Sequence, residues 1–157
     1  MDNTNIHGNI PVQVVLVHGG PGAVGSLSGL AKTLSKHFPV AEALQTKKGI
    51  PDLVEELKGL IERVSERPIA LLGHSWGAWL SCLTASQCPN MVRKLLLVGS
   101  GPFVPGGAEK VNAIRMGRFS NNDKKRINGL MRHLRDGTGS DPDKTFTELG
   151  KVMAKAD

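Results

Sequence analysis

Three short apolar runs in the first hundred residues have the length and the flanking residues of buried β-strands. Each is followed by glycine or by a histidine–glycine pair, and they cover residues 12–17, 69–72 and 94–98, with a weaker fourth run at 40–44. Between the runs, apolar residues recur at helical spacing over residues 27–37, 53–64 and 76–87. Alternating strands and helices predict an α/β protein: a parallel sheet with helices on both faces.

The pattern changes after Ser100. A segment rich in glycine and proline, residues 101–107, leads into helical patterns, and no further strand run follows. We therefore predict two parts, a core at residues 1–104 and a helical lid or separate layer at residues 105–157.

Two helices of the second part have readable ends. Ser120 and Asp123 are spaced as a capping box, and Gly137 ends that helix. Asp141 followed by Pro142 opens another helix. Each helix is expected to place its apolar residues on one face, which are Ile127, Leu130, Met131 and Leu134 in the first and Phe146, Leu149 and Met153 in the second.

The composition is that of a globular protein, 157 residues long, with 39% hydrophobic and 22% charged residues, which is one domain or part of one. No run approaches the roughly 20 apolar residues of a membrane helix. The N-terminus lacks a basic stretch followed by an apolar one. We therefore expect a cytoplasmic protein that has no membrane partner.

The net charge of +6 raises the question of an anionic partner such as a nucleic acid. Acidic residues are interspersed among the basic ones, and only 4% of residues are aromatic, which leaves little for base stacking. We therefore expect no nucleic-acid partner. Cys82 and Cys88 match neither a CxxC metal half-site nor a redox pair, so we interpret them as buried or half-buried thiols.

The sharpest chemical signal is the sequence Gly-His-Ser-Trp-Gly at residues 73–77. It matches G-x-S-x-G, follows the run at 69–72 and opens the helical pattern at 76–87. Glycine is needed on both sides because a side chain there would strike the neighbouring strand or helix, while the serine is held at the tip. The motif indicates that Ser75 is an exposed nucleophile; a glycine-rich turn with a helix-capping serine is the alternative.

A second signal is the sequence His-Gly-Gly-Pro-Gly at residues 18–22, directly after the first long run. Acyl transfer needs N–H donors aimed at the oxyanion that forms on the carbonyl oxygen. The backbone N–H of Trp76, just after the nucleophile, is one candidate donor. Because a glycine-rich loop brings a backbone N–H close without obstruction, Gly20 is the candidate for the other.

The same loop also fits a dinucleotide site. Residues 20–25 match G-x-G-x-x-G, and Glu42 lies near the end of the next strand, where a ribose ligand is expected. Against this, His18 and Gly19 intervene between strand and motif, and Pro21 removes an N–H where such a turn donates to phosphate. A dinucleotide-binding module and a non-catalytic fragment that keeps only the turn geometry remain the alternatives to an enzyme.

Together, these two motifs and the sequence Gly-Ser-Gly-Pro at residues 99–102, where the strand run at 94–98 ends, resemble the α/β-hydrolase fold. Within that fold, they resemble the proline-iminopeptidase-like group. The resemblance covers residues 12–105 and, more loosely, residues 106–157 as a helical cap. It implies that Ser75 is the nucleophile and that Gly20 and Trp76 are the oxyanion donors. That group's D-x-R-G-x-G-x-S stretch is replaced here by Ala-Leu-Gln-Thr-Lys-Lys-Gly at residues 43–49, so the substrate is left as an ester, thioester or amide.

The chain order of this fold is Ser, then Asp or Glu, then His, so the acid and base are expected beyond residue 157. His133 is the only histidine downstream of Ser75, and we interpret it as a surface residue of the cap. His18 belongs to the glycine-rich loop and His74 to the serine turn, so neither is expected to act as the base.

The sequence thus predicts the N-terminal part of a serine hydrolase that acts on a small molecule or a short peptide. No metal and no organic cofactor are implied. Because a serine without a base is a poor nucleophile near neutral pH, we expect the 157 residues alone to be inactive. We also expect them to expose a sheet edge that is prone to association.

Overall fold

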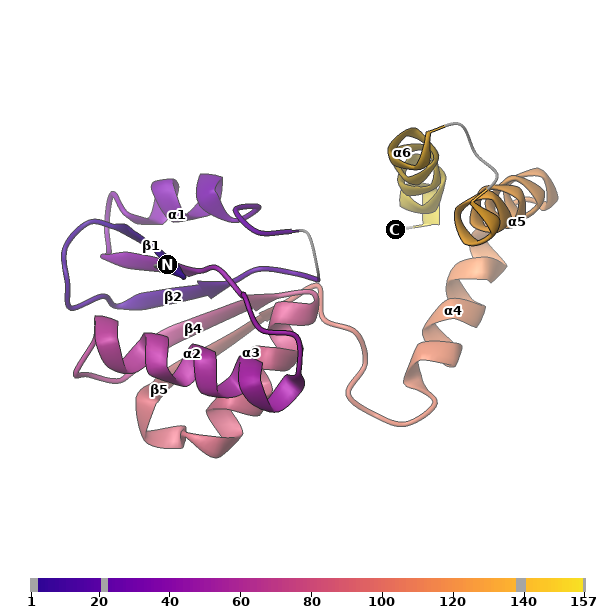
Figure 1. Cartoon of the computed structure of the whole chain (residues 1–157). Coiled ribbons are helices and arrows are strands. Elements are labelled where there is room, and N and C mark those ends of the chain that lie inside the picture. Colours follow the sequence, from indigo (N-terminus) through magenta and orange to yellow (C-terminus); the bar gives the residue numbers. More distant parts are fainter. Residues whose placement is uncertain (1–2, 21–22, 138–140, 157) are drawn as a thin grey trace. The chain divides into compact units, whose positions relative to one another are not determined.

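The computed structural model of the protein describes residues 3–20, 23–137 and 141–156, apart from the side chain of Asp143. The chain divides into two units, Met1–Gly101 and Pro102–Asp157. Figure 1 shows that the first unit carries the sheet and that the second is helical. Each unit is described by itself.

The first unit is built on a five-stranded sheet in the order β1–β3–β2–β4–β5 (Figure 1). β1 pairs antiparallel with β3, and the other neighbours pair in parallel. The mostly parallel sheet is confirmed, whereas the antiparallel edge strand was not predicted. The strands are β1 (Thr4–His7), β2 (Val14–Val17), β3 (Val40–Ala43), β4 (Ile69–His74) and β5 (Val92–Val98).

Helices cover both faces of this sheet, as predicted (Figure 1). Along β2, Leu16 joins the apolar cluster beneath α1, whereas Val15 and Val17 join the larger cluster beneath α2 and α3. Successive residues of a strand point to opposite faces of the sheet, and helices cover both faces, so all three side chains are fully buried. The helices are α1 (Ser28–Leu34), α2 (Ile50–Val64) and α3 (Trp76–Gln87), and a 3₁₀ turn, η1 (Pro89–Met91), precedes β5.

Helix α2 is held to the sheet by one apolar face. Pro51 stands in its first turn, where the missing N–H costs nothing. Burying a side chain of valine, leucine or isoleucine stabilises the fold by about 1.5–3 kcal/mol. Six residues at helical spacing are buried against the sheet: Leu53, Val54, Leu57, Leu60, Ile61 and Val64.

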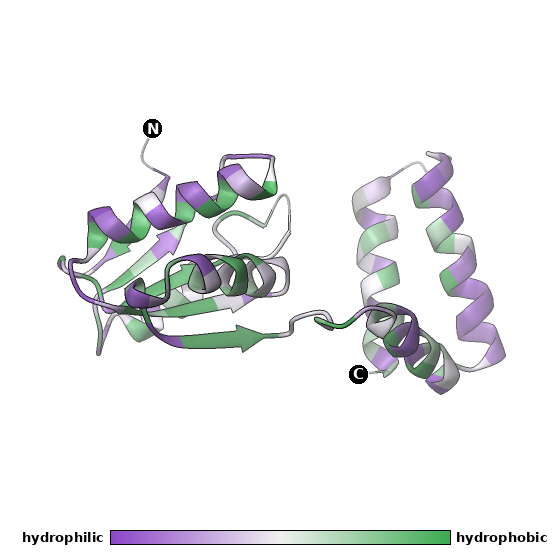
Figure 2. Ribbon diagram, turned by 90° about the horizontal axis from the view of Figure 1, so that it is seen from below, coloured by the Kyte–Doolittle hydropathy of each residue, from purple (hydrophilic) through white to green (hydrophobic). Residues whose placement is uncertain are grey.

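Strand β5 corrects the expectation that the run at residues 94–98 is buried. Its side chains from Leu95 to Val98 are 38–46% exposed. The reason is that, within the described residues, β5 pairs with β4 alone and forms an edge of the sheet. Figure 2 shows hydrophobic colouring along this edge strand, which leads into the second unit. An apolar pattern therefore identified the strand but not its position in the sheet.

The second unit consists of helices, and its described residues contain no strand, as predicted. Ser120 caps α5 by accepting a hydrogen bond from the Asp123 N–H (3.1 Å), and Gly137 follows the helix with φ of 63°. Asp141 caps α6 by accepting from the Lys144 N–H (3.1 Å). The helices are α4 (Gly107–Arg118), α5 (Asn121–Asp136) and α6 (Pro142–Met153), followed by the 3₁₀ turn η2 (Ala154–Ala156).

A small apolar cluster holds this unit together. It is built on Phe119, Ile127, Val152 and Ala156. Phe146 was expected to share the buried face of α6, but it is 69% exposed. Val152 occupies the core in its place, because the buried stripe of α6 runs through the end of the helix and η2 rather than through its middle. None of the described helices is long and apolar enough to cross a membrane.

An ion pair at the start of α5 predicts a pH effect on this unit. The Lys155 ammonium, 2.7 Å from Asp123 Oδ1, and the Ser120 hydroxyl hold the pKa of the Asp123 carboxyl below its usual value of 3.8. Because the pKa is lowered on folding, this stabilisation is present above pH 3.8 and is lost as the pH falls through the folded-state value. We expect Asp123→Asn to lower the melting temperature at pH 7 and to have a smaller effect at pH 2.5. Circular dichroism melts at both pH values measure this, and an equal loss at both would contradict it.

Candidate active site

Ser75 stands alone between the end of β4 at His74 and the start of α3 at Trp76. Its φ of 53° and ψ of −118° make it the only residue other than glycine with a positive φ among the described residues. Such a backbone is strained and persists only where its surroundings hold it. The Ser75 N–H donates to the Val98 carbonyl (2.9 Å), and the Ser75 carbonyl accepts from the Ala78 N–H (3.0 Å). The residue is exposed at the tip of this sharp turn, as the motif predicted.

Two glycines allow strand and helix to come this close. A Cβ at Gly73 would lie within 3.0 Å of the Gly77 carbonyl group, and a Cβ at Gly77 would lie equally close to the carbonyl oxygens of Val17 and His18. Both positions face backbone, which cannot move aside as a flexible side chain can. The start of α3 is therefore packed directly against the end of β2, which brings the glycine-rich loop beside the serine turn.

The glycine-rich loop starts from a buried histidine. His18 is 2% exposed, and its Nδ1 lies 2.8 Å from the Gly19 carbonyl oxygen. Its Nε2 lies 3.4 Å from the Gln45 N–H nitrogen, and the Gln45 side-chain amide donates to the His18 carbonyl (3.1 Å). One neutral tautomer satisfies both ring nitrogens, with Nδ1–H donating to Gly19 and Nε2 accepting from Gln45. His18 is thus occupied in holding the loop.

The next residues of the loop lie against the turn. A Cβ added at Gly19 would meet the Ser75 Cβ at 3.4 Å and His74 Nδ1 at 3.5 Å. A Cβ at Gly20 would meet nothing within 4 Å among the described residues, so the side of Gly20 on which a side chain would stand is open. Pro21 and Gly22 lie outside the described residues.

No base for Ser75 is found among the described residues. None of the hydrogen bonds among them joins a histidine ring to the Ser75 hydroxyl. His133 lies on α5 in the second unit and is exposed, as its interpretation as a surface residue required. Cys82 and Cys88 are free and half-buried, in line with the interpretation from their spacing.

Glu42 does not occupy the position that a ribose ligand needs. It is fully buried on β3, accepts a hydrogen bond from the Ser28 hydroxyl (2.8 Å) and has His7 Nε2 at 3.9 Å. A carboxylate enclosed in this way cannot reach a ribose in solution. The residue that supported the dinucleotide interpretation is therefore part of the interior beneath α1.

A pocket of about 650 Å³ adjoins the loop and the turn. Its volume is within the usual range of small-molecule sites. The residues that line it all belong to the first unit, and they are His18, Val24, Gln45, Lys47, Lys48, Leu53 and Trp76. His18 starts the glycine-rich loop and Trp76 starts α3, so the pocket adjoins one candidate oxyanion donor, Trp76, and the start of the loop that carries the other.

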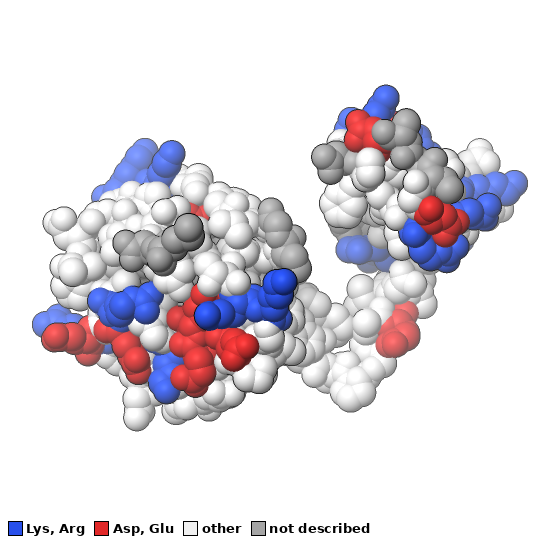
Figure 3. All heavy atoms as spheres, in the orientation of Figure 1, with Lys and Arg blue, Asp and Glu red and all other residues white. Residues whose placement is uncertain are grey.

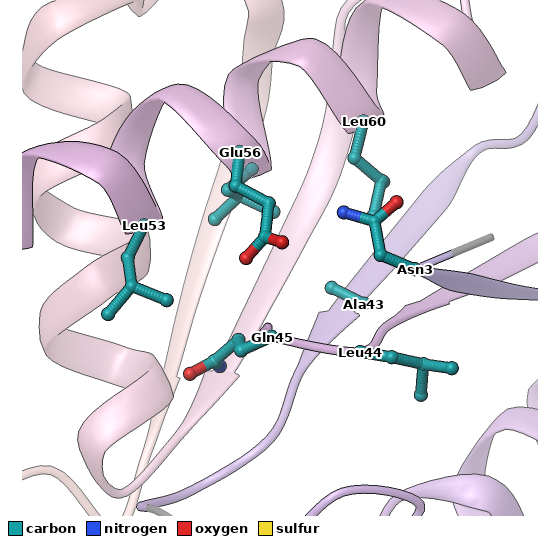
Figure 4. A pocket seen from close by; sticks show the side chains of 8 residues that line it. Asn3, Ala43, Leu44, Gln45, Leu53, Glu56 and Leu60 are labelled. Carbon is teal, nitrogen blue, oxygen red and sulfur yellow. The ribbon is translucent and has the colours of Figure 1, made fainter. Parts of the chain in front are cut away.

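The segment along one side of this pocket, residues 45–48, is tied to α2. The Glu56 carboxylate accepts hydrogen bonds from the Thr46 N–H (3.0 Å), from the Thr46 hydroxyl and from the Lys47 N–H (3.4 Å). Figure 4 shows Glu56 reaching from α2 toward this segment, across a cavity of only about 10 Å³. Partial burial raises the pKa of the Glu56 carboxyl, but these hydrogen bonds and one from Asn3 outweigh it, so the pKa lies below its usual 4.5.

With this geometry in place, comparison with known proteins defines the class of the protein. The family model described as alpha/beta hydrolase matches residues 31–119, more than half of the chain, and the chain belongs to that family. A protein of Haemophilus influenzae, named provisionally as an esterase/lipase, is 23% identical over 104 residues. That stretch covers 60% of this chain and 36% of the relative.

Solved structures agree on the fold. VinJ is matched with a TM-score of 0.71 at 19% identity, over 97% of this chain and 55% of that one. An alpha/beta hydrolase from Sphaerobacter thermophilus is matched with a TM-score of 0.57 at 20% identity, over 98% of this chain and 64% of that one. An epoxide hydrolase from Bacillus megaterium is matched with a TM-score of 0.60 at 19% identity, over 88% of this chain and 51% of that one. The chain therefore spans about a third of the curated relative and 51–64% of these structures.

Proposed function

We propose that the protein is a serine hydrolase that cleaves an ester, thioester or amide bond with Ser75 as the nucleophile. The observation that carries this proposal is the backbone of Ser75, held at φ of 53° between a buried strand and a helix, with the residue exposed at the tip. A strained turn of this kind presents a serine hydroxyl to a substrate above the sheet. Membership of the alpha/beta hydrolase family supports a hydrolytic reaction.

The reaction proceeds in two acyl-transfer steps. Ser75 Oγ attacks the carbonyl carbon, and the N–H groups of Trp76 and Gly20 stabilise the oxyanion of the tetrahedral intermediate. The leaving group departs as an alcohol, thiol or amine, and water then hydrolyses the acyl-enzyme. The proton moves through a histidine base oriented by an acid, which we assign to residues outside 1–157 because the chain spans only part of its relatives.

The two units take different roles in this proposal. Residues 1–104 form the part of the core that carries the nucleophile and the oxyanion donors, and we assign residues 105–157 to a helical cap. Residues 43–49 depart from the proline-iminopeptidase-like pattern, so the substrate is an ester, thioester or amide that need not be a proline peptide.

A serine-directed fluorophosphonate probe tests the nucleophile. In the whole protein, we expect mass spectrometry of digested material to locate the label on Ser75, because an activated serine attacks phosphorus as it attacks a carbonyl carbon. Ser75→Ala removes the label. Ser100→Ala is the matched control, since Ser100 is exposed and follows the neighbouring strand β5. Labelling that survives in Ser75→Ala would overturn the assignment.

A further inference from the structure

The pocket beside the serine turn has an unbalanced charge. Among the residues that line it, Lys47 and Lys48 are cationic and none is acidic. Val24, Leu53 and Trp76 supply apolar surface in the same pocket. This combination suits a ligand that has an apolar part and an anionic end.

The two lysines are free to meet such a ligand. Both side chains are exposed, and neither forms an ion pair within the described part of the chain. The Glu56 carboxylate receives hydrogen bonds from the backbone of Lys47 and from Thr46 rather than from a lysine ammonium. Glu56 also lines the small cavity on the α2 side and not this pocket.

The start of the segment that carries the lysines is hydrogen-bonded to the surroundings of the site. Gln45 is hydrogen-bonded to His18 at the start of the glycine-rich loop, and Thr46 is bonded to Glu56 on α2. Cations on a segment held in this way keep their place relative to the reacting bond, so less order is lost when a substrate binds. Figure 3 shows acidic and basic side chains intermingled on the face of the first unit that carries α2.

We propose that Lys47 and Lys48 select substrates whose acyl part ends in an anionic group, a carboxylate or a phosphate-like dianion. This inference rests on the proposed function, because the reacting carbonyl is placed at Ser75. The lysines act through charge at the substrate's far end and take no part in bond making. Their effect should therefore fall on KM more than on kcat, and it should weaken as salt is added.

Matched substrates test this specificity. The mono-p-nitrophenyl ester of succinic acid carries a carboxylate, p-nitrophenyl butyrate is its neutral counterpart, and the 3-phosphonopropionate ester carries the phosphate-like group. In Lys47→Gln/Lys48→Gln we expect KM to rise about 10-fold for the charged esters, as two partly exposed ion pairs allow. The neutral ester should keep its KM. The charged ester whose KM rises more identifies the preferred anion.

A control variant separates local charge from total charge. Lys32→Gln/Lys36→Gln removes the same charge from exposed positions at the end of α1 and should leave all three KM values unchanged. An equal rise in KM for neutral and charged esters in the Lys47/Lys48 variant would overturn the proposal. So would a wild-type protein that prefers the butyrate ester.

Binding to inactive protein keeps this test independent of catalysis. Calorimetry with Ser75→Ala protein compares N-(4-nitrophenyl)succinamate with N-(4-nitrophenyl)butyramide. We expect the succinamate to bind about 10-fold more weakly once both lysines are replaced, while the butyramide is unaffected. Equal succinamate affinity with and without the lysines would refute their role. Lysine-dependent binding in a protein that shows no Ser75-dependent hydrolysis would instead refute the proposed function.

Discussion

Ser75→Ala is expected to lower kcat/KM for ester hydrolysis by the whole protein on the order of 10⁴-fold or more, to the rate left by binding and oxyanion stabilisation alone. The loss is large because the hydroxyl forms the covalent bond to the substrate, and no other residue occupies the tip between β4 and α3. Steady-state kinetics with p-nitrophenyl butyrate measure it.

The fold should survive this substitution. The Ser75 hydroxyl makes no hydrogen bond among the described residues, and its two backbone hydrogen bonds do not depend on the side chain. Circular dichroism of Ser75→Ala should therefore match that of the wild type, and Ser100→Ala should retain full activity. A Ser75→Ala protein that keeps more than a tenth of wild-type kcat/KM would mean that another group is the nucleophile.

Gly77→Ala is expected to lower the free energy of unfolding of the first unit by about 3 kcal/mol or more. Overpacking against side chains costs about 1–3 kcal/mol, and here the added Cβ meets the backbone oxygens of Val17 and His18, which cannot rotate away. The contact can be relieved only by moving α3 away from β2, which would also displace Ser75 from the glycine-rich loop. Urea unfolding followed by circular dichroism measures the change.

Gly59→Ala on α2 is the matched control for this substitution. Gly59 also lies in a helix of the first unit, but its added Cβ would meet only the end of the Arg63 side chain, at 3.6 Å. Alanine is the better helix former there, so the control should gain about 0.5–1 kcal/mol. If Gly77→Ala were as stable as Gly59→Ala, the close packing of α3 on β2 would be refuted.

Local patterns predicted much of this fold. The run at 69–72 and the glycines around Ser75 were enough to place a strand, a sharp turn and a helix in order, because each depends on neighbours in sequence. Ser120 and Asp141 were likewise recognised as helix caps, since a cap bonds to an N–H only three residues ahead.

Other features depend on partners far away along the chain, and no local pattern contained them. β1 (Thr4–His7) lacks an apolar run, because it is an edge strand held by backbone hydrogen bonds to β3. Glu42 looked like a ligand at a strand end, yet Ser28 covers it from a separate helix. The contact of Gln45 with His18 spans 27 residues, and it decides where Lys47 and Lys48 stand.

The sequence by itself determined which segments are strands and helices, which residue occupies the tip of the serine turn, and where glycine is indispensable. Those outcomes follow from side-chain periodicity and backbone sterics, which act over a few residues. Only the tertiary structure decided that β5 lies at the edge with an exposed apolar surface, that Glu42 is interior, and that two lysines share a pocket with the glycine-rich loop. Burial and charge at those positions depend on which elements become neighbours when the whole sheet assembles.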